Sequence, residues 1–134
     1  MMFVTRRETF SASHRLYNPE LSEERNLELF DKCANLHGHG HNYVLEVTVM
    51  GESNKDSGYV IDIKRLKEII RREIISKVDH KHLNHDVEFL KNVIPTSENV
   101  AQAFWNVLKD KMGSARLYSI RLQETENNSV EYRG

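Results

Sequence analysis

Apolar and polar residues alternate along two stretches of the chain, as they do in strands with one buried face. In residues 2–13, positions 2, 4, 10 and 12 are apolar, whereas positions 5, 7, 9 and 11 are polar. From Tyr43 onward, positions 43, 45, 47 and 49 are apolar, and Glu46 and Thr48 lie between them. Because successive side chains point to opposite faces of a strand, both stretches predict half-buried strands.

Two further stretches repeat their apolar residues at helical spacing. Asp62 can cap a helix over residues 63–78, whose apolar face is formed by Leu66, Ile69, Ile70 and Ile74. The run from Pro95 to Glu98 predicts the start of a second helix, and Gly113 predicts its end. The buried stripe of this second helix is expected to be Val100, Ala101, Phe104, Trp105 and Leu108.

The remaining segments complete an α+β chain. Residues 117–124 and 129–132 predict two closing strands joined through Asn127-Asn128, and residues 59–61 fit a short strand. Residues 22–30 form either a helical turn or a loop. Since strands that are neighbours in sequence usually pair, we expect an antiparallel four-stranded sheet with two helices on one face. The length fits one domain over residues 1–134.

Charge and cysteine content exclude several classes of protein. The 134 residues include 19 Lys and Arg against 20 Asp and Glu, and this balance gives no general attraction to nucleic acid or acidic membranes. No apolar run approaches the ~18 residues of a membrane span. The opening MMFVTRRETF has charges where a signal peptide has its apolar stretch. With one cysteine no internal disulfide can form, so a cytoplasmic location is expected.

All seven histidines fall in three short stretches, FSASH, HGHGH and DHKHLNH. His39 and His41 are two apart at the entrance to the second strand, so their side chains point the same way. If the first two strands pair antiparallel, His14 at the end of the first comes beside them. Three neutral imidazoles favour Zn²⁺ and leave a coordination position open for substrate. His37 has the same parity, which alone does not exclude it as a ligand.

Four other residues can be interpreted either as catalytic or binding groups or as ordinary structural or surface residues. Cys33 is either a small buried residue or a base or nucleophile whose thiolate a nearby metal ion would stabilise. Asp79 can set the tautomer of His80 if a loop lets the adjacent side chains meet; otherwise His80 is a helix-end histidine. Glu124 is either a surface carboxylate or the partner of a flat, guanidine-like edge such as that of a pterin.

Six motifs in order along nearly the whole chain resemble the 6-pyruvoyl tetrahydropterin synthase family, which includes the 6-carboxytetrahydropterin synthases of the queuosine route. The motifs are FSASH, CANLHGHGHNY, DSGYVIDIKRLK, VDHKHLNHDV, PTSENVA and QETENNSVEY. The resemblance implies the tunnelling fold, with four main strands and two helices in each subunit. Three subunits would close a barrel, and two trimers would stack into a homohexamer.

The same resemblance implies a role for each candidate residue. It makes His14, His39 and His41 the zinc ligands, Cys33, Asp79 and His80 the proton-transfer residues, and Glu124 the anchor of the pterin ring, with Thr96 and Ser97 near it. The cysteine and the Asp-His pair would come from different subunits. The implied reaction removes triphosphate from 7,8-dihydroneopterin triphosphate and forms 6-pyruvoyl tetrahydropterin.

Alternative functions remain open from the sequence. The two branches of the family differ in the spacing between the cysteine and HGH, which is five residues in pyruvoyl-forming and three in typical carboxy-forming enzymes. HGHGH fits both, with His39 at five and His37 at three, and the following Asn42-Tyr43 favours the first. A zinc hydrolase would usually continue HxH into an Asp-His pair. A non-catalytic metal-binding protein would leave Cys33 and Glu124 without a role.

Overall fold

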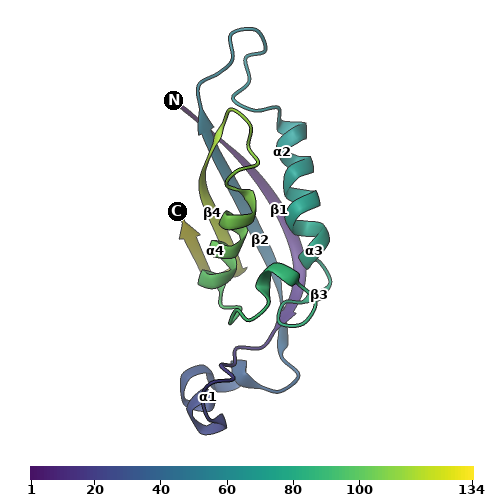
Figure 1. Cartoon of the computed structure of the whole chain (residues 1–134), viewed down its shortest axis with the longest axis vertical. Coiled ribbons are helices and arrows are strands. Elements are labelled where there is room, and N and C mark those ends of the chain that lie inside the picture. The colour runs from purple at the N-terminus through teal and green to yellow at the C-terminus, as the bar shows by residue number, and fades with distance from the viewer.

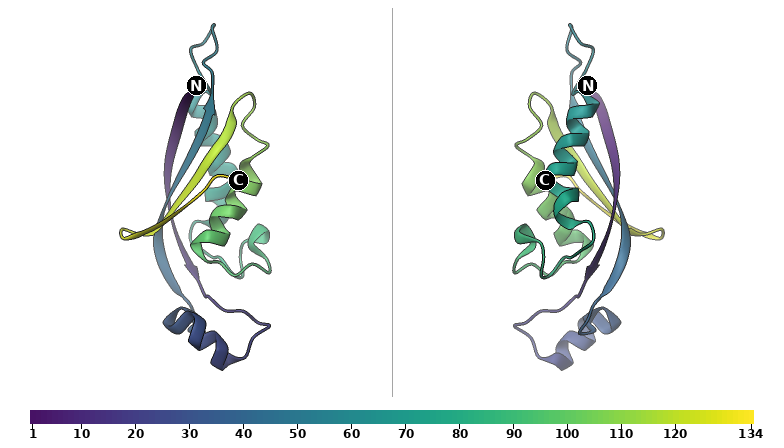
Figure 2. Two further views of the ribbon diagram at one scale, coloured as in Figure 1. Left: turned by 90° about the vertical axis from the view of Figure 1, so that its left-hand side faces the viewer. Right: turned by 90° about the vertical axis from the view of Figure 1, so that its right-hand side faces the viewer.

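The computed structural model describes residues 1–134 as one twisted sheet with helices on one of its faces (Figures 1 and 2). The strands are β1 (Met2–His14), β2 (His39–Gly51), β3 (Lys81–His82), β4 (Arg116–Thr125) and β5 (Asn128–Tyr132). The helices are α1 (Glu23–Phe30), α2 (Ile63–Ile70), α3 (Ser76–Val78) and α4 (Ser97–Leu108). Helices α2 and α4 cover the sheet, and α1 lies beyond its lower end in Figure 1.

The two long strands confirm the alternation seen in the sequence. Strands β1 and β2 pair antiparallel along their whole length, from Met2 opposite Gly51 to His14 opposite His39. The side chains that face the helices are buried, namely Phe10, Ala12, Tyr43, Leu45, Val47 and Val49. Strand β2 begins at His39, before the predicted start at Tyr43, so the HxH segment belongs to the regular sheet.

The expected four-stranded antiparallel sheet is wrong in one respect, because the sheet has five strands and is mixed. Its order is β3-β1-β2-β4-β5, and β3 runs parallel to β1, with Ala12 opposite Lys81. A strand of two residues has no alternation to detect, so only its contact with β1 defines it. The short strand expected at residues 59–61 is absent; Val60 and Ile61 are instead buried as the loop reaches Asp62.

Helix starts agree with the caps predicted from the sequence. The Asp62 carboxylate accepts a hydrogen bond from the Lys64 backbone N–H, and the Thr96 hydroxyl accepts one from that of Asn99. Between α2 and α3 the chain forms a π-helical turn, Arg71–Ile75, yet the predicted apolar face stays buried through Ile74. Helix α4 ends at Leu108, before Gly113. Residues 23–30 form α1, a third helical segment that the sequence left open.

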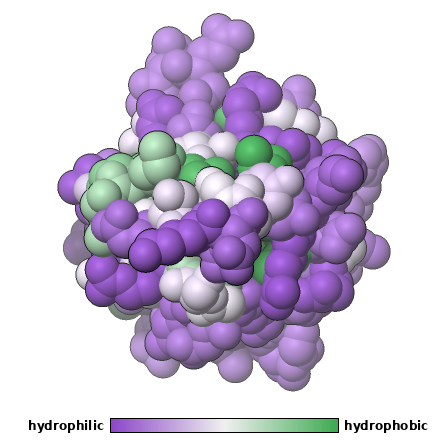
Figure 3. All heavy atoms as spheres, turned by 90° about the horizontal axis from the view of Figure 1, so that it is seen from above, coloured by the Kyte–Doolittle hydropathy of each residue, from purple (hydrophilic) through white to green (hydrophobic).

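The buried apolar side chains form one continuous cluster of 25 residues between the sheet and helices α2 and α4. Seen from above the N-terminal end, the surface is mostly hydrophilic, with apolar side chains between polar ones (Figure 3). Exposed large apolar residues include Met2, Phe3, Tyr59 and Ile63. None of the helices combines the length and the apolar character needed to cross a bilayer.

Candidate metal centre and active site

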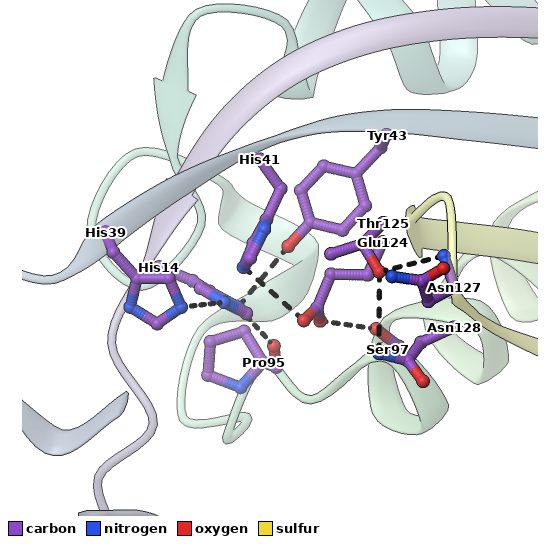
Figure 4. A network of polar contacts seen from close by, with 10 residues as sticks. All are labelled: His14, His39, His41, Tyr43, Pro95, Ser97, Glu124, Thr125, Asn127 and Asn128. Carbon is purple, nitrogen blue, oxygen red and sulfur yellow. Dashed lines mark hydrogen bonds and ion pairs between the residues drawn. The ribbon is translucent and has the colours of Figure 1, made fainter. Parts of the chain in front are cut away.

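Three histidines meet at the lower end of the β1–β2 ladder (Figure 4). His14 ends β1 opposite His39, and His41 lies two residues further along β2 on the same face. One ring nitrogen from each residue lies within 4.8 Å of the others, and the Nε2 atoms of His14 and His39 are 3.2 Å apart. The antiparallel pairing predicted from the sequence therefore brings these imidazoles together.

Burial keeps the two inner imidazoles neutral, which is the form that binds a metal ion. The His14 side chain is fully buried, and burial lowers its pKa below the ordinary value. Burial also lowers the pKa of His41, although the Glu124 carboxylate opposes this shift. The Nδ1–H of His14 donates to the Pro95 carbonyl at 2.9 Å, so its Nε2 lone pair faces the other histidines.

His41 has the one buried side-chain polar atom that lacks a hydrogen bond, its Nε2. This atom lies 3.4 Å from Oε1 of Glu124, but the orientation makes no hydrogen bond. A buried nitrogen without a partner is costly unless something else satisfies it. A metal ion held by His14, His39 and His41 would do so, and the donor set fits such an ion.

Of the two histidine pairs that HGHGH offers, the structure places His39 and His41 in this cluster and leaves His37 outside it. The residue is exposed in a turn before β2, and Gly38 separates it from the strand with a positive φ of 73°. Strand parity therefore does not extend to His37. A Cβ atom at Gly38 would lie 2.6 Å from the His14 carbonyl oxygen, so the turn requires glycine where it passes β1.

Glu124 and Ser97 meet beside the histidines, on the side of His41 (Figure 4). The Ser97 hydroxyl donates to Oε2 of Glu124 at 2.7 Å, which joins the first turn of α4 to the end of β4. The Glu124 side chain is 25% exposed, so its carboxylate is open to a ligand. Thr96 caps α4 through its hydroxyl instead of contacting Glu124. Of the three residues predicted to lie at the pterin ring, Glu124, Thr96 and Ser97, the structure brings Glu124 and Ser97 into contact.

Asp79 and His80 lie at the edge of the sheet beside β1. Oδ1 of Asp79 is 3.0 Å from Nδ1 of His80 and also accepts from the Ser11 backbone N–H. That backbone hydrogen bond is the main reason why the pKa of Asp79 is lowered. His80 has a positive φ of 61°, the loop geometry that lets adjacent side chains meet. Its side chain is 82% exposed, so the pair faces away from the chain's own core.

Cys33 is half-buried in a 3₁₀ turn, Asp31–Ala34, that follows α1. Its carbonyl accepts a hydrogen bond from the Leu16 backbone N–H at 2.8 Å. This contact ties the turn to the segment directly after His14. The Asp79-His80 pair is attached instead to Ser11, further up β1. Within one chain, Cys33 thus lies beside the segment that follows β1, whereas His80 lies beside β1 itself.

Comparison with known proteins decides the family. Residues 3–134 match the sequence model of the 6-pyruvoyl tetrahydropterin synthase family. The 6-pyruvoyl tetrahydrobiopterin synthases of Drosophila melanogaster and Homo sapiens are 47% and 46% identical to the chain. Both alignments cover 98% of this chain, with 79% of the fly protein and 90% of the human one. The chain belongs to the 6-pyruvoyl tetrahydropterin synthase family.

Solved structures agree with this assignment. The Caenorhabditis elegans 6-pyruvoyl tetrahydropterin synthase superposes with a TM-score of 0.93 at 42% identity, covering 99% of this chain and 95% of that chain. A 6-carboxy-5,6,7,8-tetrahydropterin synthase of Rickettsia bellii is 29% identical, over 98% of this chain and 99% of its own. The chain is therefore an enzyme of the 6-pyruvoyl tetrahydropterin synthase type.

Three residues that lie at or beside the candidate site were not predicted from the sequence. The Pro95 carbonyl orients His14, but a backbone acceptor has no signal in the sequence. Tyr43 places its hydroxyl 3.4 Å from Nδ1 of His14, and its ring stacks on Phe10. Its parity with His39 and His41 would have placed it on the same face. Asn84 binds the backbone of Arg15, next to His14, across 69 residues of sequence.

Proposed function

We propose that this enzyme is a zinc-dependent lyase that converts 7,8-dihydroneopterin triphosphate to 6-pyruvoyl tetrahydropterin and releases triphosphate. The observation that carries the proposal is the convergence of three histidines beside a Glu124 carboxylate that is open to a ligand. The names of the relatives support this choice of product. Six relatives named as 6-pyruvoyl tetrahydrobiopterin synthases are 42–47% identical, whereas the carboxy synthase of Rickettsia bellii is 29% identical.

Zinc is the metal that this donor set suits best. The cluster contains His14, His39 and His41 and neither thiolate nor carboxylate, and three protein ligands leave a coordination position for substrate. Zinc held there would supply a Lewis acid that stabilises negative charge on the side-chain oxygens of the substrate. The Pro95 carbonyl holds His14 in the required tautomer, so the protein orients its ligand before substrate arrives.

Glu124 positions the pterin ring in this proposal. A carboxylate accepts two parallel N–H bonds from the guanidine-like edge of a pterin, and such charge-assisted pairs set orientation as well as affinity. The Ser97 hydroxyl occupies one side of Oε2 and limits rotation of the carboxylate. Since Glu124 lies beside His41, a ring bound there would direct its C6 side chain toward the histidines.

Cys33, Asp79 and His80 carry the proton transfers. Cys33 as thiolate removes a proton from the substrate side chain and returns it elsewhere, while Asp79 orients His80 as the second acid-base group. The exposed edge position of His80 supports a role in the site of a neighbouring subunit. A homohexamer built from two trimers, with sites at the subunit interfaces, would join the two groups, and an isolated subunit would be inactive.

The carboxy-forming reaction of the queuosine branch is the second candidate. One feature favours it, the three-residue spacing between Cys33 and His37. However, the clustered histidines are His39 and His41, which correspond to the five-residue spacing of pyruvoyl-forming enzymes. The exposed turn position of His37 likewise supports the pyruvoyl product.

A direct assay separates these functions. The purified protein, analysed for bound metal, is incubated with 7,8-dihydroneopterin triphosphate, and the products are identified by mass. We expect one zinc per chain, triphosphate release and a 6-pyruvoyl product. A carboxy product with acetaldehyde would assign the enzyme to the queuosine branch. Intact substrate after incubation with the zinc-loaded protein would refute both reactions.

A further inference from the structure

Arg15, directly after His14, carries a positive charge that the fold holds in place and leaves unpaired. Its Nε–H donates to the Ala34 carbonyl at 2.9 Å, and its guanidinium carbon lies 3.8 Å from the centre of the Tyr17 ring. None of the ion pairs in the structure includes Arg15. Stacking and one hydrogen bond thus orient the guanidinium while both of its Nη groups stay free to donate.

The main chain of Arg15 is held as firmly as its side chain. Oδ1 of Asn84 accepts from the Arg15 backbone N–H at 2.8 Å, and Nδ2 of Asn84 donates to the Arg15 carbonyl at 2.8 Å. These contacts join Arg15 to Asn84 two residues beyond Ser13 and His82, the last paired residues of β1 and β3, and they do so through a side chain. Fixing a cation before a ligand arrives lowers the entropy lost on binding.

Arg15 lines a cleft whose walls contain both polar and apolar side chains, which we call the Arg15 cleft. Its other walls come from the segment 17–20, from Leu36, from Asn84 and His85, and from residues 92–94. Asn92 contributes a neutral amide, and Glu20 is the one carboxylate. Ile94 precedes Pro95, whose carbonyl binds His14, so the Arg15 cleft adjoins the metal centre.

The register of the sheet places Glu124, the histidines and the Arg15 cleft one after another along the strands. Val44 pairs with Gln123, so Glu124 lies near the level of Tyr43 on β2. His41 and then His39 follow toward the start of β2, where His14 is the partner of His39. The chain beyond His14 therefore starts on the side of the histidines away from Glu124, as Figure 4 shows for His39. Arg15 begins that segment.

We propose that the Arg15 cleft binds the triphosphate chain of the substrate, with Arg15 as its principal cation. The inference rests on the proposed function. A pterin ring at Glu124 places its three-carbon side chain over the histidines, and the phosphates on the terminal carbon then extend past His39. A planar guanidinium donates two parallel N–H bonds to phosphate oxygens, and Arg15 lines the cleft at that end of the site.

The test compares Arg15→Gln with the wild type in binding and in turnover. Binding of inorganic tripolyphosphate to the zinc-loaded protein is measured by calorimetry, and bound zinc is assayed afterwards because polyphosphates chelate metal ions. We expect Arg15→Gln to raise both the Kd for tripolyphosphate and the KM for the substrate about ten-fold or more. The inhibition constant of unphosphorylated 7,8-dihydroneopterin should stay within about two-fold of wild type. Arg15→Lys should be intermediate, since it keeps charge without the planar fork.

The matched control is Arg116→Gln, which removes an exposed arginine at the opposite end of the sheet, where Arg116 pairs with Met50. It should change none of the three constants. An unchanged tripolyphosphate Kd in Arg15→Gln would overturn the proposal, as would an equal weakening of dihydroneopterin. Because tripolyphosphate binding needs no turnover, a wild type that binds it through Arg15 but leaves the substrate intact would refute the proposed reaction instead.

Discussion

Single contacts decide which histidines of HGHGH join His14 in the cluster. His39 and His41 lie on the buried face of β2, and the Pro95 carbonyl turns His14 toward them. His37, two residues earlier, is exposed because the chain turns at Gly38. One backbone turn therefore determines which histidines of HGHGH join His14 in the cluster, whereas histidine spacing alone leaves two candidate pairs.

We expect His39→Ala to lose most of its bound zinc and His37→Ala to keep it. Removal of one of three ligands weakens a metal site severely, whereas His37 contributes no atom to the cluster. The measurement is zinc per chain by elemental analysis after dialysis against a weak chelator. Zinc loss from His37→Ala would show that the turn before β2 supplies a ligand.

A second prediction concerns the turn that carries the polypeptide into β2. Gly38→Ala should reduce the free energy of unfolding by more than about 1 kcal/mol and weaken zinc binding, because the new Cβ would meet the His14 carbonyl oxygen. Gly58→Ala is the matched control, since Gly58 has a similar φ of 75° but nothing within 4 Å of the added atom. Its cost should be about 1 kcal/mol with zinc affinity unchanged. Chemical denaturation and zinc titration measure both; equal effects in the two variants would refute the steric argument.

The contact between β1 and the π-helical turn after α2 depends on an ionised carboxylate. Glu8 is buried, and its Oε1 accepts hydrogen bonds from Arg6 and Arg71. Burial raises the pKa of Glu8, but the two guanidinium groups outweigh it and hold the pKa below its ordinary value of 4.5. A carboxyl group with a lowered pKa stabilises the folded state above the unfolded pKa, and this stability is lost as pH falls through the folded pKa.

Glu8→Gln should therefore lower the free energy of unfolding by about 1–2 kcal/mol at pH 7. The difference from wild type should shrink as pH falls below 4.5, because the wild-type carboxyl then becomes neutral as well. Denaturation curves at several pH values provide the measurement. Glu46→Gln is the control, since its ion pair with Arg121 is more exposed and should contribute about 0.5 kcal/mol or less. A pH-independent difference for Glu8→Gln would assign its effect to packing.

The positions of the proposed catalytic groups on one subunit lead to a prediction about the assembly. Cys33 is tied to the segment after His14, whereas His80 is exposed at the sheet edge beside Ser11. If neighbouring subunits complete each site, Cys33→Ala and His80→Ala should each lose activity by about 100-fold or more while keeping zinc. A subunit with Cys33→Ala should then complement a neighbouring subunit with His80→Ala.

Co-expression of the two variants with different tags, followed by purification on both tags, isolates mixed assemblies. Random mixing leaves intact Cys33 and His80 together at about a quarter of the interfaces, so about a quarter of wild-type activity should return. A mixture of separately purified variants, without subunit exchange, is the control. Mixed assemblies as inactive as the single variants would show that each site takes both groups from one chain.

Local patterns in the sequence were enough for the long elements and for the clustering of the three histidines. Strand alternation, helix caps at Asp62 and Thr96, and the spacing of His39 and His41 depend on residues only a few positions apart. Strands β1 and β2 are consecutive along the chain, so their pairing is expected, and this pairing brings His14 to the other two histidines. These features are local, so the order of residues determines them.

Contacts between distant segments determined the rest. Strand β3 exists because residues 81–82 lie beside β1, and Asn84 reaches Arg15 across 69 positions. Ser97 meets Glu124 because α4 packs over the end of β4. The energy of such contacts depends on which surfaces the folded chain brings together, and no local pattern encodes it. The fold therefore decides which polar residues surround the histidines and where a free cation lies beside them.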